Sequence, residues 1–168
     1  AIHELIRAIL QDEPLKMRRL AEIFHVDVAA LHEIWVLCGM EDASGVNLEQ
    51  MIAAARQCAE LVIGAVYDGN PVMSLSTPHS LRETERVMEE ILHQALPDSP
   101  DAVLVRCSGL SNTTNCREAY LLTLENLEDA RRIYPHKKLF LQGELEFAAS
   151  CRRRINEGEA AAARRTLP

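Results

Sequence analysis

Lysine and arginine are missing from one long stretch of this chain, the residues between Arg19 and Arg56. From residue 21 to residue 55 the charged side chains are six carboxylates, with no basic group among them. Because Lys and Arg supply most of the affinity for a phosphate backbone, a surface built from this stretch is predicted to repel nucleic acid.

Other absences exclude further classes of protein. Aromatic residues make up only 4% of the chain, and few lie near its arginines, which disfavours a surface that stacks single-stranded bases. The apolar runs are far shorter than the roughly 20 residues that a membrane-spanning helix needs. The sequence contains no C-x-x-C pair, and no His or Cys residues lie at the short spacings of a structural zinc site. We therefore predict a chain that does not enter a membrane and binds neither a metal nor another cofactor.

The cysteines are an odd number, five, without the spacing of a disulfide framework. Four of them lie in segments that have the pattern of a helix or strand interior. We therefore expect reduced, buried thiols and take the cytoplasm as the default location.

What is present is an apolar content of 48% over 168 residues, enough for one compact domain with a core. In most segments the apolar residues recur at three- and four-residue spacings, which is typical of amphipathic helices. We therefore predict a mainly α fold of about seven helices in a single domain over residues 1–157, with a flexible tail at 158–168. One small β element is expected near residues 102–107, a short segment rich in β-branched side chains.

The boundaries of these helices follow from caps and breakers such as Pro14, Gly39 and Pro97. The expected helices span residues 2–10, 15–24, 28–38, 48–66, 81–96, 116–133 and 137–157. Between residues 61 and 75 a second interpretation stays open, two strands joined by a turn at Asp68 and Gly69.

Residues 20–34 have the spacing of a two-helix corner. Ala21 is small enough to let two helices cross closely, and the apolar positions that would pack them are Phe24, Val26, Leu31 and Ile34. On these residues the segment resembles the bacterial helix-turn-helix family, which implies such a fold for residues 1–40. His25 stands at the turn, where that family usually has glycine because the backbone needs a positive φ. Since the second helix carries no cation, we expect a packing corner rather than a DNA reader.

Charge is distributed unevenly along the chain. Residues 1–128 carry 9 basic and 20 acidic groups, whereas residues 129–168 carry 9 basic and 5 acidic groups. A basic end on an acidic body favours a protein partner or a second copy of the chain, with nucleic acid as the less favoured partner. The predicted partner-binding residues are Arg131, Arg132, Lys137, Lys138, Arg152, Arg153 and Arg154.

A loop rich in hydroxyls and amides follows Cys107, at the end of the expected strand. Open α/β sheets place their ligand sites at such positions. A C-x5-R phosphate loop would need arginine at position 113, which is Thr113, and one glycine is too few for a phosphate-binding glycine loop. The predicted ligand-binding residues are Cys107, Ser108, Gly109, Ser111 and Asn112, with capping of the following helix as the alternative use.

These observations predict a non-catalytic interaction, regulatory or assembly module that self-associates. One alternative is a helix-turn-helix transcriptional regulator whose helical remainder senses a ligand. The other is a small enzyme or ligand sensor that uses the loop after Cys107. No catalytic motif or isolated carboxylate pair is present, so we predict no catalytic residue and favour the non-enzyme. The uneven charge further predicts that association weakens with salt.

Overall fold

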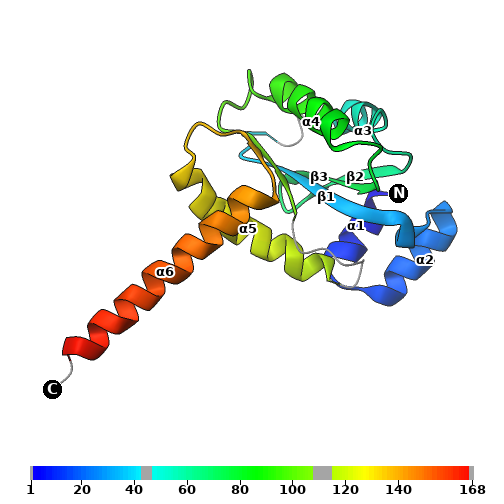
Figure 1. The fold of residues 1–168 in the computed structure, drawn as a ribbon. Coiled ribbons are helices and arrows are strands. Elements are labelled where there is room, and N and C mark those ends of the chain that lie inside the picture. Colours follow the sequence, from blue (N-terminus) through cyan, green and yellow to red (C-terminus); the bar gives the residue numbers. More distant parts are fainter. Residues whose placement is uncertain (1, 43–46, 108–114, 167–168) are drawn as a thin grey trace.

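A computed structural model describes residues 2–42, 47–107 and 115–166 of the chain. Within these ranges, helices cover both faces of a single five-stranded sheet (Figure 1). In chain order the elements are α1 (His3–Leu10), α2 (Pro14–Phe24), the short 3-10 helix η1 (Val28–Ala30), β1 (Leu31–Cys38), α3 (Leu48–Ala55), β2 (Val62–Tyr67), β3 (Asn70–Ser76), α4 (Leu81–Ala95), β4 (Val103–Arg106), α5 (Cys116–Ile133), β5 (Leu139–Phe140) and α6 (Gln142–Thr166).

The sheet has the order β2-β3-β1-β4-β5, with β1 at its centre. Its strands pair antiparallel, except that β4 and β5 run parallel. Trp35 on β1 lies opposite Met73 on one side and Arg106 on the other. The carboxylate of Glu33 accepts hydrogen bonds from Trp35 Nε1 at 2.9 Å and from Arg106 Nε at 3.1 Å, so the polar atoms of this central region are satisfied.

Side chains of β1 alternate between two separate cores. Ile34, Val36 and Cys38 pack with α1, α5 and α6 on one face. Trp35 and Leu37 pack with α3 and α4 on the other face. Because both faces of the strand are covered, its apolar residues follow one another without the alternation of a half-buried strand.

The predicted mainly α fold of about seven helices is wrong, because the described chain forms an α/β fold. The clearest error is the helix expected over residues 28–38, which is η1 followed by β1. A continuous apolar run such as Ile34–Cys38 satisfies helical spacing as well as the pattern of a doubly buried strand, so periodicity alone does not separate them.

The helix-turn-helix prediction for residues 1–40 fails at its second helix. Helices α1 and α2 lie where they were expected, and His25 has the positive φ of 54° that the turn requires. Asp27, however, caps only the 3-10 turn, where its carboxylate accepts from the amide of Ala29 at 3.1 Å. The segment that would be the recognition helix is the central strand β1, so the chain has no helix there to enter a DNA groove.

The long helix expected over residues 48–66 is also wrong, whereas the hairpin alternative is confirmed. Helix α3 ends at Ala55, and β2 and β3 are joined by a turn in which Asp68 and Gly69 have φ values of 50° and 80°. Positive φ at both central residues is the signature of a tight hairpin turn. A Cβ on Gly64 of β2 would lie 2.9 Å from Cδ1 of Ile52, so glycine at this position lets α3 pack closely on the strand.

The end of the chain departs from its predicted form as well. The strand expected near residues 102–107 exists as β4, but it is one of five strands. In place of a helix starting at residue 137, the short β5 pairs with β4 before α6 begins. Helix α6 continues to Thr166, and the flexibility predicted for the tail at 158–168 stays a prediction.

Candidate interaction surface on helices α5 and α6

Helix α6 is anchored to the body of the protein only at its beginning. Leu145 and Ala148 are fully buried against α5 and the sheet. Residues 152–160 are all exposed, and Figure 1 shows the helix crossing α5 and continuing away from the body. We call residues 152–166 the arm. A helix with this division has one end fixed by the core and the other end in solvent.

An apolar stripe runs along α6 from the anchored part onto the arm. Phe147, Cys151 and Ile155 recur at four-residue intervals, which places them in one row on the helix surface. Phe147 is 49% exposed and Ile155 is 57% exposed. We call these three residues the stripe. Together with Ile133 of α5, they line a hollow of about 380 Å³ between the two helices.

Phe147 also lies beside Tyr134, with their ring centres 6.4 Å apart. The aromatic pair therefore joins the stripe to the end of α5. Apolar side chains that are exposed singly are ordinary, but a contiguous patch rimmed by polar groups is typical of an interaction site.

The arm leaves the body at an ion pair between the two helices. Arg152 donates two hydrogen bonds to the carboxylate of Asp129, at 2.6 and 3.2 Å. This hydrogen-bonded guanidinium lowers the pKa of Asp129 below its ordinary value. Because the contact is a planar fork, it joins α5 and α6 at the point where the arm departs.

The predicted partner-binding cations do not act as one group. Five of the seven bind neighbours within the chain, whereas Arg153 and Arg154 make no hydrogen bond or ion pair within the described ranges. The five engaged side chains and their partners are Arg131 with the carbonyl of Asp101, Lys138 with the carbonyl of Pro100, Lys137 with Glu144, and both Arg132 and Arg152 with Asp129. The cations at the end of α5 and just before β5, together with Arg152, thus bind within the chain, whereas Arg153 and Arg154 stay available.

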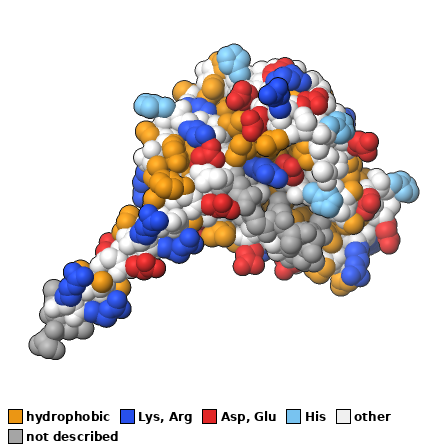
Figure 2. Space-filling view, in the orientation of Figure 1, with side chains coloured by type: hydrophobic (Ala, Val, Ile, Leu, Met, Phe, Trp, Pro, Cys, Tyr) orange, Lys and Arg blue, Asp and Glu red, His pale blue; other side chains and the backbone are white. Residues whose placement is uncertain are grey.

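Cations of the arm lie on two different sides of the helix. The stripe continues along the row 151–155–158–162, in which Gly158 and Ala162 are small. Arg154 and Arg165 lie in the adjoining row 154–158–161–165, whereas Arg153 and Arg164 lie in the row 153–157–160–164 on the opposite side. In Figure 2 the blue side chains of Lys and Arg stand out along the projecting arm. The stripe is therefore bordered by Arg154 and Arg165.

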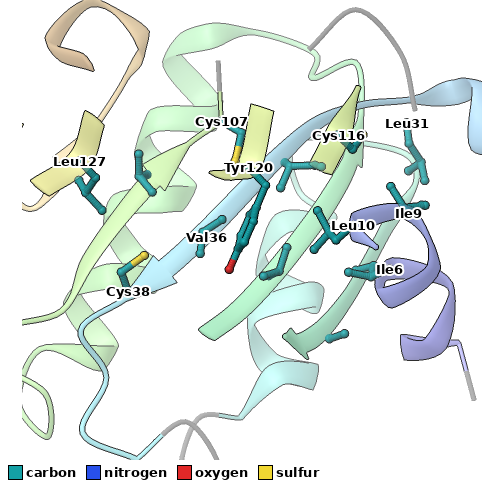
Figure 3. Close-up of a cluster of buried hydrophobic side chains, with 14 of the residues drawn as sticks. Ile6, Ile9, Leu10, Leu31, Val36, Cys38, Cys107, Cys116, Tyr120 and Leu127 are labelled. Carbon is teal, nitrogen blue, oxygen red and sulfur yellow. The ribbon is translucent and has the colours of Figure 1, made fainter. Parts of the chain in front are cut away.

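Cys107, the first of the predicted ligand-binding residues, lies inside the core. Only 4% of its surface is exposed, and Figure 3 shows it in the same apolar cluster as Val36 and Tyr120. Burial raises the pKa of its thiol to about 12, so the reactive thiolate is not formed near neutral pH. The other predicted ligand residues, Ser108, Gly109, Ser111 and Asn112, lie outside the described residues.

The expectation of buried thiols is confirmed for the four cysteines at 38, 58, 107 and 116, all of which are free of disulfides. Cys151, in the stripe, is the partly exposed one. In the part of the chain that the structure describes, no three His, Cys, Asp or Glu side chains come together as metal ligands. No helix in that part is both long enough and apolar enough to cross a membrane.

A second hollow, absent from the sequence-based predictions, lies where β1 ends between α3 and α4. It has a volume of about 410 Å³, and its floor includes Leu37, Met51 and Ile91. Its rim carries three carboxylates, and none of the described residues that line it is basic. We call this hollow the acidic groove, and the three rim residues are Glu41, Asp42 and Asp98.

A signal for this groove was present in the sequence. Two adjacent acids, Glu41 and Asp42, lie three and four positions after Cys38, where the apolar run ends. Asp98, however, lies in the turn after α4, 56 positions beyond Asp42, and only the folded chain brings it to the same rim.

No known family model matches the chain, and no curated protein matches it.

Proposed function

We propose that this chain is a non-catalytic interaction and assembly module that self-associates through α6. The observation that supports this proposal is the stripe of Phe147, Cys151 and Ile155, which leaves the body on a helix that the rest of the described chain covers only at its beginning. Fully burying one large apolar side chain contributes about 1.5–3 kcal/mol, and two of the three stripe residues are about half exposed. Covering the stripe is therefore favourable.

The arm itself also favours a partner. Helices shorter than about 12–15 residues are marginal in water, and their stability in proteins comes mainly from packing an apolar face. Between Cys151 and the end of α6, none of the side chains that the structure describes belongs to either core. A surface that packs against the stripe would therefore stabilise the arm as well.

Charge favours a second copy of the chain as that partner. Residues 152–166 contain five arginines and two glutamates, which give a net charge of +3. Since the whole chain has a net charge of −7, the rest of the chain has a net charge of −10. Two arms side by side would place arginines against arginines. The arm of one copy is instead attracted to the acidic body of another.

Sedimentation at low and at high salt tests the proposal. We expect the wild-type protein to form a dimer or larger assembly at low salt and to dissociate at high salt, because exposed charges are screened. The substitution Ile155→Asn should weaken association while the monomer stays folded. Its matched control is Ile23→Asn, since Ile23 on α2 is the same residue type and is also 57% exposed.

Equal weakening by Ile155→Asn and Ile23→Asn would argue for nonspecific apolar association. A wild-type protein that stays monomeric at both salt concentrations would contradict the proposal.

A further inference from the structure

The acidic groove and the arm have complementary chemistry. The floor of the groove is apolar and buried, with Leu37, Met51 and Ile91 all belonging to the core that lies under α3 and α4. Its rim is acidic and carries no basic side chain among the described residues. The arm presents the reverse combination, an apolar row bordered by Arg154 and Arg165.

The size of the groove suits side chains rather than a whole helix. Pockets that bind small ligands have volumes of roughly 300–1,000 Å³, and the acidic groove, at about 410 Å³, lies in the lower half of that range. Ile155, with the aliphatic part of a neighbouring arginine, is an appropriate occupant. Arginine stems pack along apolar surface while the guanidinium stays at the rim.

The position of the arm favours a groove on another copy. The arm departs from the face of the sheet that α5 covers, whereas the acidic groove belongs to the face that α3 and α4 cover. In Figure 1 the arm runs away from α3 and α4. From Arg154 to Thr166 the helix spans about 18 Å at 1.5 Å per residue, long enough to lie across a neighbouring molecule.

We infer that the acidic groove of one copy receives the arm of a second copy, an inference that rests on the proposed self-association. Ile155 lies over the floor formed by Leu37, Met51 and Ile91. Arg154 and Arg165 lie against the carboxylates of the rim. If each arm enters the groove of the other molecule, the two contacts are related by a twofold axis and the assembly closes as a dimer.

Charge reversal of each side separately tests the inference by sedimentation at low salt. The groove variant is Glu41→Lys with Asp98→Lys, and the arm variant is Arg154→Glu with Arg165→Glu. Either variant places like charges together in both contacts of its own dimer, so we expect self-association to weaken by at least about tenfold.

A mixture of the two variants is the decisive measurement. In a mixed dimer, one contact joins the reversed arm to the reversed groove, and the other joins a wild-type arm to a wild-type groove. Opposite charges then meet in both contacts, so the mixture should associate about as well as the wild-type protein. Association recovers in the mixture only if the arm of one copy binds the acidic groove of another.

Matched controls separate the position of a charge from the net charge. Arg153→Glu with Arg164→Glu makes the same change in net charge on the opposite side of the arm. It should therefore change association less than the arm variant. Glu22→Lys with Glu60→Lys alters two exposed acids away from the groove, and it should change association less than the groove variant. Unfolding curves confirm that each variant is folded.

The outcomes distinguish this inference from the proposed function. If Ile155→Asn prevents association and the groove variant does not weaken it, the proposed function holds and the acidic groove is not the receiving surface. If each variant is weakened but their mixture does not recover, the inference is equally overturned. If the wild-type protein is monomeric, the proposed function fails first, and the inference fails with it.

Discussion

Helices α4 and α6 differ in how completely the chain itself covers them. Helix α4 has 15 residues, five of which are buried in the core: Thr84, Val87, Met88, Ile91 and Leu92. Helix α6 has 25 residues, and its fully buried side chains are Leu145 and Ala148. Packing within the chain therefore accounts for α4, whereas the second half of α6 owes its form to something other than the core of this molecule.

Proline substitutions in the two helices should have the most different effects on stability. Glu89→Pro is an exposed substitution in α4, and it should lower the free energy of unfolding by about 3 kcal/mol or more, because it removes a helical hydrogen bond and clashes with the preceding turn. Ala162→Pro in the arm should leave the unfolding midpoint of the monomer nearly unchanged and reduce only the helical circular dichroism signal.

Denaturant unfolding followed by circular dichroism gives both the free energy of unfolding and the helical signal of the folded protein. It is measured at high salt, where self-association is expected to be weakest. Glu89→Ala and Ala162→Gly are the controls for lost side-chain contacts and for helix propensity. Equal destabilisation by the two prolines would show that the arm belongs to the cooperative core.

The N-terminal cap of α4 should give the next largest effect. The hydroxyl of Ser80 accepts a hydrogen bond from the amide of Glu83 at 3.1 Å, which satisfies one of the free amides of the first turn. Ser80→Ala should therefore lower the free energy of unfolding by about 1 kcal/mol. Ser80→Asn should keep most of the stability, since asparagine caps helices equally well. Equal losses in both variants would assign the effect to something other than the cap.

The ion pair at the root of the arm should contribute less than the cap, and its contribution should depend on pH. Asp129 has a pKa below its ordinary value of 3.8 in the folded protein, because Arg152 binds the carboxylate. The pair therefore stabilises the fold fully at neutral pH, and this stabilisation is lost as the pH falls below 3.8 toward the folded pKa.

Wild-type protein and Asp129→Asn should accordingly differ slightly in unfolding free energy at neutral pH and converge in acid. Glu128→Gln, at an exposed neighbouring position, is the control. A difference that stays constant down to acidic pH would exclude the ion pair as its cause.

The smallest effect, on reactivity rather than stability, concerns the thiols. Cys151 is partly exposed on α6, whereas Cys107 is buried and its pKa is raised to about 12. A soluble alkylating reagent should modify Cys151 in the native protein and Cys107 only after unfolding, as measured by mass spectrometry of peptides. Association should also slow the modification of Cys151, because this residue lies in the stripe. Early modification of Cys107 would contradict its burial.

Much of the helical structure could be predicted from the sequence, and the central strands could not. Helix α4 alternates buried and charged positions with a clear cap, so its pattern has one interpretation. Strand β1 is covered on both faces, and Ile34–Cys38 therefore lacks the period of two that marks a half-exposed strand. The hairpin was open only as a second interpretation, supported by the turn residues Asp68 and Gly69, because the apolar residues before them also fit a helix.

The candidate surface was predictable only in part, for a similar reason. The basic end of the chain is visible in the sequence, but the sequence does not show which cations the fold already binds. The carbonyls of Pro100 and Asp101 hold Lys138 and Arg131 from 38 and 30 positions away. The acidic groove likewise combines residues that are distant in sequence, so no local motif indicates it.

Helix α6 continues without interruption from Leu145 in the core to Thr166 at the end of the arm. An unbroken helix is stiff, and it therefore works as a lever whose short end lies inside the protein. A tilt of about 10° at Cys151 moves the tip of the arm by about 4 Å, since the helix rises 1.5 Å per residue. A change of tilt at the end that Leu145 and Ala148 anchor would therefore be amplified toward the tip of the arm.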